Sequence, residues 1–246
     1  MSHRDSRQGF ALVEVLVIIA VVGLIALLAV SGLFPARNYG SSERNPSTSL
    51  KTLASAQADF RSNDRDWNHV TDFWTANVSG LYTMTSAAVR GAVANDTTDP
   101  SIKLIELSVA AADADDTFYA AGGENLALTN FAVYSAKAGY WYAALTADLS
   151  LPASDPERVY RRDTGGTPGM GKVHHETKFG FISFPDSQSA GKYVFIVNEN
   201  NTIFRSAVSA PVKGSTSNPP GLAGMSPLYL NWPDDVTLKA YWSKLD

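Results

Sequence analysis

The strongest constraint on this chain is an apolar run of about twenty residues near its N-terminus, from Phe10 to Val30. A helix rises ~1.5 Å per residue, so a run of this length spans the ~30 Å hydrocarbon core of a bilayer. One carboxylate, Glu14, interrupts the run close to its start. Because a charged side chain in hydrocarbon costs on the order of a few kcal/mol, a carboxylate at this place indicates a function.

The segment in front of the apolar run is short and polar, and it carries Arg4 and Arg7. A positive flank on this side predicts a cytoplasmic N-terminus and a body in the periplasm or outside the cell. Three interpretations fit this arrangement: a plain membrane anchor, a signal peptide cleaved near Ala29–Ser31, and a segment that is processed at its start. The run is long for a signal peptide and contains a carboxylate, which disfavours the second interpretation.

The third interpretation rests on spacing. Gly9 and Phe10 are followed by Glu14, the fifth residue counted from Phe10, and then by a long apolar helix. This pattern resembles the processing motif of type IV pilins and type II secretion pseudopilins. The resemblance implies that a prepilin peptidase cuts after Gly9, that Phe10 becomes the methylated N-terminus, and that Glu14 takes part in assembly. A buried charge is tolerable mainly when it is paired, and the new amine of Phe10 on a neighbouring subunit offers such a partner.

The resemblance also implies a function and a location. The expected protein is a non-enzymatic structural subunit that joins other pilin-like subunits, through its N-terminal helix, in a pilus or a type II secretion pseudopilus. It crosses the inner membrane once, with its head outside the cytoplasm. An alternative function is that of a membrane-tethered extracytoplasmic binding module that does not polymerise. In one version of this hypothesis the module depends on calcium. An exported hydrolase is a third, although no catalytic group is evident in the sequence.

The predicted organisation follows from the apolar run and from the Pro, Gly, Ser and Asn residues that come after it, which favour a linker. The expected parts are a prepilin leader at 1–9, a transmembrane and assembly helix at 10–34, a linker at 35–49 and an extracytoplasmic globular head at 50–246.

The predicted class is α+β and pilin-like: the N-terminal transmembrane helix is followed by a helix and a mainly antiparallel sheet in the head. Apolar residues at helical spacing predict the helix over Leu50–Arg61, and Asp234 or Asp235 begins a closing helix that runs through Leu245. Runs of β-branched and aromatic residues predict strands at Ile102–Val109, Phe131–Ser135, Tyr140–Leu145, Phe179–Phe184, Tyr193–Val197 and Thr202–Val208.

An acidic loop in the head is the candidate metal site. Its oxygen-bearing positions have the spacing of the first part of a calcium loop; they are Asp64, Asp66, Asn68, Val70 (through its carbonyl) and Asp72. His69 replaces the glycine that an EF-hand needs, and Thr75 replaces its bidentate glutamate, so a looser calcium site is the hypothesis. The alternative is a loop whose Asp and Asn side chains bond their own backbone.

The stretch around this loop, residues 59–84, is similar to one found in a group of bacterial pilin-like proteins of unknown role, whose heads carry an acidic loop followed by Asp-Phe-Trp. In this chain these three residues are Asp72, Phe73 and Trp74. The two aromatic residues are predicted to pack the loop onto the core.

Other motifs are weaker. Adjacent histidines such as His174 and His175 point to opposite faces of a strand and lack the spacing of a helical zinc motif, so we expect loop or surface imidazoles. The segment 166–173 has the glycine and lysine spacing of a P-loop but ends in Val173, where a Ser or Thr would hold Mg²⁺. The acidic residues at 113–116 are expected on a solvated surface.

Composition excludes some classes. The net charge is −4, which argues against a nucleic-acid partner because such proteins carry a basic patch. The chain has no cysteine, which removes disulfides and thiolate metal sites.

Overall fold

The computed structural model describes residues 44–66, 69–84, 102–114, 125–160, 174–186, 190–207 and 231–245, together with Val17, Ile19 and Val21. The chain divides into two units, Met1–Ser41 and Ser42–Asp246. The three described residues of the first unit are helical and exposed. Gly9, Phe10, Glu14 and the remainder of the predicted membrane segment lie outside the described residues. None of the helices that the structure describes is both long enough and apolar enough to cross a bilayer.

The second unit begins with a long helix, α2, which spans Arg44–Asn63. The predicted helix at Leu50–Arg61 is therefore confirmed, but residues 44–49 of the predicted linker are helical too. Pro46 lies in the first turn described, where a proline is tolerated because the first N–H groups of a helix have no partner within it. Leu50, Leu53 and Phe60 lie on the buried face of this helix.

The main sheet has five antiparallel strands in the order β2-β5-β6-β7-β9. These strands are β2 (Tyr140–Ala144), β5 (Gly180–Pro185), β6 (Tyr193–Asn198), β7 (Ile203–Ala207) and β9 (Ser243–Leu245). The first four confirm predicted strands to within one or two residues. The polar loop between β6 and β7 forms a hairpin turn, in which Asn201 has a positive φ of 53° and its N–H donates to the Asn198 carbonyl.

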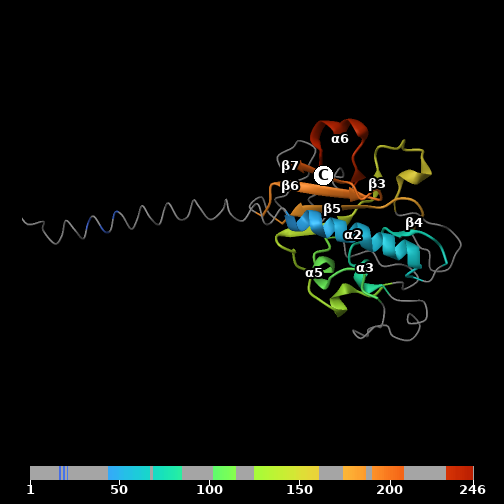
Figure 1. Cartoon of the computed structure of the whole chain (residues 1–246), viewed down its shortest axis with the longest axis horizontal. Coiled ribbons are helices and arrows are strands. Elements are labelled where there is room, and N and C mark those ends of the chain that lie inside the picture. The colour runs from blue at the N-terminus through green and yellow to red at the C-terminus, as the bar shows by residue number, and fades with distance from the viewer. Residues whose placement is uncertain are drawn as a thin grey trace, which may run out of the picture. The chain divides into compact units, whose positions relative to one another are not determined.

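Both faces of this sheet are buried. One face packs against α2, and it includes Phe181, Phe195 and Val197. The opposite face, with Ile182 and Ile196, belongs to a second cluster, against which Leu238 of α6 (Asp235–Tyr241) and Trp242, directly after this helix, pack. Figure 1 shows α2 and α6 on opposite sides of the sheet. The unit is therefore α+β with a mostly antiparallel sheet between helices.

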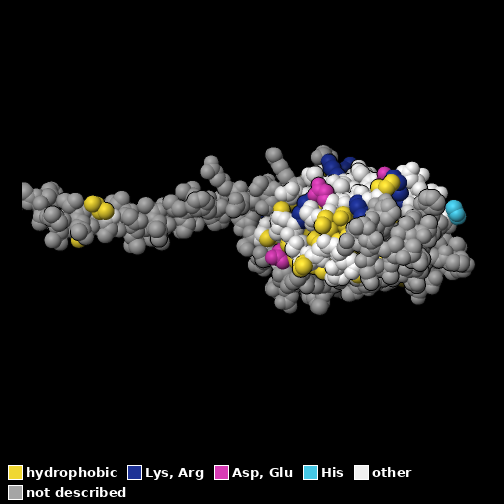
Figure 2. Space-filling model, turned by 90° about the horizontal axis from the view of Figure 1, so that it is seen from below, with side chains coloured by type: hydrophobic (Ala, Val, Ile, Leu, Met, Phe, Trp, Pro, Cys, Tyr) yellow, Lys and Arg dark blue, Asp and Glu magenta, His cyan; other side chains and the backbone are white. Residues whose placement is uncertain are grey.

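Short elements surround this framework. Two small sheets are formed by β1 (Phe73–Trp74) with β4 (His174–His175), antiparallel, and by β3 (Ala147–Asp148) with β8 (Asn231–Trp232), parallel. The short helices are α3 (Gly80–Thr83), α5 (Leu107–Ala110), η1 (Leu128–Asn130), η2 (Pro156–Arg158) and α6 (Asp235–Tyr241). On the face that Figure 2 shows, Lys and Arg side chains of this unit stand in small separate groups.

Several predictions for this unit are wrong. The segments 102–109 and 131–135 form no strand, and the first ends in α5. The closing helix stops at Tyr241, and β9 follows it as an edge strand of the main sheet. Asp113, expected on a solvated surface, is buried, and its Oδ2 accepts hydrogen bonds from the N–H groups of Val78 and Ser79 at 3.0 and 2.6 Å. Asp113 thus serves as a buried acceptor for the backbone at the start of α3.

The N-terminus of α6 is capped as predicted. Asp234 Oδ1 accepts a hydrogen bond from Thr237 N, and Asp234 Oδ2 accepts one from the Thr237 hydroxyl, both at 2.9 Å. These bonds hold the pKa of Asp234 below its ordinary value of 3.8.

We expect Asp234→Ala to lower the Tm by roughly 2–4 °C and Asp234→Asn, which can still cap, to lower it less. The lowered pKa means that the cap stabilises the folded state above the ordinary pKa and that this effect is lost as the pH falls through the folded-state pKa. Thermal unfolding of the three proteins at neutral and acidic pH checks this. If the difference in Tm between the wild type and Asp234→Ala grew at low pH, the stated contribution of the Asp234 carboxylate would be contradicted.

Candidate functional site

The described part of the chain contains one buried group of potential metal ligands, formed by Asp66, Asp72 and His174. Their side chains are 0–1% exposed. The Nε2 atom of His174 lies 3.4 Å from Asp66 Oδ2, and its Nδ1 atom lies 3.4 Å from Asp72 Oδ1. The imidazole therefore lies between two carboxylates in the interior of the protein.

Two segments that are far apart in the sequence supply these side chains: the loop between α2 and β1, and strand β4. Asp66 lies in the turn that follows α2, and Asp72 directly precedes β1. His174 is the first residue of β4, where it pairs with Trp74 of β1. The β1–β4 pairing thus brings the histidine to the acidic loop, although about a hundred residues separate them in the sequence.

Aromatic rings hold the imidazole in place. Phe60 of α2 stacks on His174 with ring centroids 6.0 Å apart and an interplanar angle of 23°. Trp74 presents its ring at 82° to the imidazole, at 5.5 Å. These rings keep water from the imidazole, so charges in the group interact in a medium of low dielectric constant.

Asp72 has an additional property that bears on ligand binding. Both of its carboxylate oxygens are buried, and neither accepts a hydrogen bond within the part of the chain that the structure describes. A buried carboxylate without hydrogen bonds is unfavourable unless a cation compensates it. His174 Nδ1, at 3.4 Å, is a nearby group that can carry positive charge.

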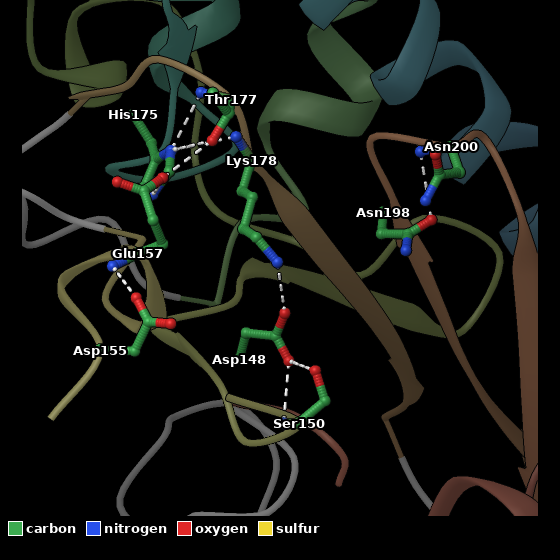
Figure 3. A network of polar contacts seen from close by, with 9 residues as sticks. All are labelled: Asp148, Ser150, Asp155, Glu157, His175, Thr177, Lys178, Asn198 and Asn200. Carbon is green, nitrogen blue, oxygen red and sulfur yellow. Dashed lines mark hydrogen bonds and ion pairs between the residues drawn. The ribbon is translucent and has the colours of Figure 1, made fainter. Parts of the chain in front are cut away.

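The neighbouring His175 faces a different environment (Figure 3). Its Nδ1 accepts hydrogen bonds from the backbone N–H groups of Thr177 and Lys178, at 3.1 and 3.0 Å. An Nδ1 that accepts two N–H groups carries no proton, so the ring is neutral with its proton on Nε2. That nitrogen lies 3.5 Å from Glu157 Oε2, and the ring packs edge-on against Tyr160. His175 thus organises the turn after β4 and is not part of the group around His174.

A second polar pair in Figure 3 joins this turn to β3. Lys178 Nζ lies 2.7 Å from Asp148 Oδ2, and the other oxygen of Asp148 accepts from the N–H and the hydroxyl of Ser150.

Burial, together with the charges of Asp148 and Glu199, raises the pKa of Tyr160 well above its ordinary value. The tyrosine therefore packs as a neutral ring beside His175.

The predicted loop residues are only partly brought together. Asp66 and Asp72 meet at the site, whereas Asp64 is not part of the group: its carboxylate accepts from the backbone N–H of His69 at 3.1–3.2 Å. Val70 is half-buried, and Asn68 lies outside the described residues. For Asp64 the local backbone interaction, which was the alternative to a metal ligand, is observed.

Sequence reasoning did not identify His174 as a member of this group. We expected His174 and His175 at a surface or in a loop, but both are fully buried. The expected alternation holds, since the two rings contact different neighbours, but both faces of β4 are covered. The signal in the sequence was the pair of adjacent histidines. The pairing of β4 with β1 places these histidines next to the acidic and aromatic segment.

Comparison with known proteins gives one result, at the N-terminus. Residues 4–30 match the family model of the prokaryotic N-terminal methylation motif, which confirms the resemblance of the Gly9–Phe10–Glu14 segment to a processing signal. No curated protein and no solved structure matches the chain. The match lies within the first unit and does not extend to the head, with its buried carboxylates and histidine.

Proposed function

We propose that this chain, whose residues 4–30 carry the prepilin-processing signal of type IV pilins and pseudopilins, is a structural subunit of a pilin-like filament. The motif implies a membrane-anchored precursor that prepilin peptidase processes. In the proposal, cleavage follows Gly9, Phe10 becomes the methylated N-terminus, and the apolar helix joins other pilin-like subunits in a pilus or a secretion pseudopilus. The head stands on the outer side of the inner membrane and carries no catalytic role.

The observation that carries this proposal is the position of Glu14 within the matched motif. It is the fifth residue from Phe10 in an otherwise apolar run. A lone carboxylate in hydrocarbon is unfavourable, and the amine that cleavage creates on Phe10 of a neighbouring subunit can neutralise it. The α+β head with its mostly antiparallel sheet is consistent with a pilin-like subunit.

We expect the mature protein, produced together with a prepilin peptidase, to begin at Phe10 and to carry one added methyl group. Gly9→Leu is expected to remain uncut, because a large side chain replaces the glycine at the cleavage site. Mass spectrometry of the intact protein and of its N-terminal peptide measures both. A mature N-terminus near Gly32, or an intact leader in the wild type, would contradict the proposal.

Assembly is tested separately with Glu14→Leu. This variant is expected to be inserted in the membrane and cleaved, but its assembled fraction should fall at least tenfold, because the proposed ion pair is lost. Val13→Leu, an apolar exchange at the neighbouring position, is the matched control and should assemble normally. Normal assembly of Glu14→Leu would favour a membrane-tethered module that does not polymerise.

A further inference from the structure

We propose that Asp66, Asp72 and His174 bind one divalent cation of the zinc class, which joins the end of α2, the start of β1 and β4. This inference concerns the head, and it does not depend on the filament proposal. It rests on four observations: the distances within the group, its burial, the carboxylate of Asp72 that accepts no hydrogen bond, and the mixture of oxygen and nitrogen ligands.

The distances suit a cation better than a direct ion pair. Both His174 contacts measure 3.4 Å, whereas a charge-assisted N–H···O bond is roughly 2.7–2.9 Å long. Zinc bonds of ~2.0–2.1 Å in tetrahedral geometry place neighbouring ligand atoms roughly 3.4 Å apart. One potential ligand atom from each residue lies within 4.8 Å of the others, so small side-chain rotations close the group on a central ion.

The two ring nitrogens of His174 face different carboxylates, and a single ion binds one of them. The opposite nitrogen then carries the proton and points toward one oxygen of the carboxylate on its own side, which leaves the other oxygen of that carboxylate for the ion. This is the carboxylate–histidine–metal arrangement that fixes the tautomer and the ring orientation at many metal sites. The stacked Phe60 and the edge-on Trp74 hold the ring in the plane that this arrangement requires.

Charge balance also favours a divalent ion. Within the group of three residues, two carboxylates that are 0–1% exposed face one imidazole, which supplies at most one positive charge. A divalent cation balances both carboxylates while the histidine stays neutral. It also supplies a partner for the Asp72 oxygens, which accept no hydrogen bond among the described residues.

The donor set selects the class of metal. Calcium takes oxygen ligands, usually six to eight of them. A site with one imidazole nitrogen and two carboxylate oxygens suits zinc and its neighbours among the divalent transition metals. The calcium hypothesis for the acidic loop therefore changes: of the five predicted ligands the group retains Asp66 and Asp72, His174 joins them, and the preferred ion is zinc. Because the three residues are closed off from solvent, the role is structural.

The test uses the full chain, purified in detergent from cells supplied with zinc. Elemental analysis by mass spectrometry is expected to find about one zinc per chain. Removal of the metal by a chelator should lower the Tm, and zinc at about a hundredfold excess over its Kd should restore it by roughly 5–10 °C. Asp72→Asn and His174→Gln are expected to weaken zinc binding at least tenfold.

Asp64→Asn is the matched control, since Asp64 belongs to the same loop but not to the group, and it should keep its zinc. The wild-type measurement decides the matter even if a variant fails to fold. Less than a tenth of an equivalent of zinc, manganese or iron, together with a Tm that does not respond to these ions, would overturn the site in favour of a metal-free ion cluster. Stabilisation by calcium and not by zinc would overturn the assignment of this site to metals of the zinc class.

Discussion

Trp74→Ala is expected to lower the free energy of unfolding by about 3–5 kcal/mol. The indole is fully buried and lies 6.4 Å from the ring of Phe60 and 5.5 Å from that of His174. The backbone of Gly80 packs directly on it: a Cβ atom at that position would come within 2.3 Å of the indole ring. Contact this close leaves no side chain free to fill the space, so truncation creates a cavity that does not collapse.

The indole also organises the segment before α3. Its Nε1 donates to the carbonyl and to the side-chain oxygen of Asn77, at 3.1 and 3.2 Å. The same side-chain oxygen accepts from the Gly80 N–H at 2.8 Å. Loss of the indole removes one of the donors that hold Asn77 in this position, which adds to the effect of the cavity.

Urea unfolding followed by circular dichroism measures the Trp74→Ala effect. Val133→Ala is the matched control, because Val133 is 86% exposed and truncation of an exposed side chain changes stability by about 0.5 kcal/mol or less. A loss below about 1 kcal/mol for Trp74→Ala would contradict the packing described for the Phe60, Trp74 and Gly80 contact.

The second large effect is expected for Gln57→Leu, at about 2–4 kcal/mol of destabilisation. Gln57 is fully buried on α2, and its amide bonds both polar groups of one residue in β1. The Oε1 atom accepts from Trp74 N at 3.0 Å, and the Nε2 group donates to the Trp74 carbonyl. The Gln57 amide therefore bonds the backbone of Trp74 as the backbone of a neighbouring strand would. A leucine of similar size fills the space but removes both of the hydrogen bonds that Gln57 makes with the backbone of Trp74.

Ser55→Leu is the control for this substitution, since it adds a leucine on the exposed side of the same helix and should change stability little. Equilibrium unfolding in urea compares the two variants with the wild type. If Gln57→Leu is as stable as Ser55→Leu, the two hydrogen bonds to Trp74 contribute nothing net, and the stated role of Gln57 is wrong.

The elements that sequence reasoning located are those with a strong local signal. β2, β5 and β6 are nearly continuous apolar runs of five or six residues, β7 begins with two apolar residues, and α2 has apolar residues at helical spacing. Such patterns are set by burial and are visible locally. β1, β4 and β8 have two residues each, which is too short for any period. Their conformation depends on partners far away in the sequence.

The candidate metal site shows the same limit. Asp66 and Asp72 were predicted as ligands because they lie in one short acidic loop. His174 comes from another part of the chain, and only the pairing of β4 with β1 places it beside them. Asp64 was predicted too, yet its carboxylate turns to the backbone of its own loop. Spacing in a loop tells which oxygens are available, and the tertiary structure determines which of them face inward.

The burial of both faces of the main sheet determines how the head responds to stress. β5 and β6 contribute alternate side chains to the two apolar clusters, so the same backbone supports both. Loss of either cluster removes the packing from one face of the same central strands, so we expect the two clusters to unfold together. We therefore expect the described part of the second unit to lose its structure in one cooperative step when the chain is heated or pulled.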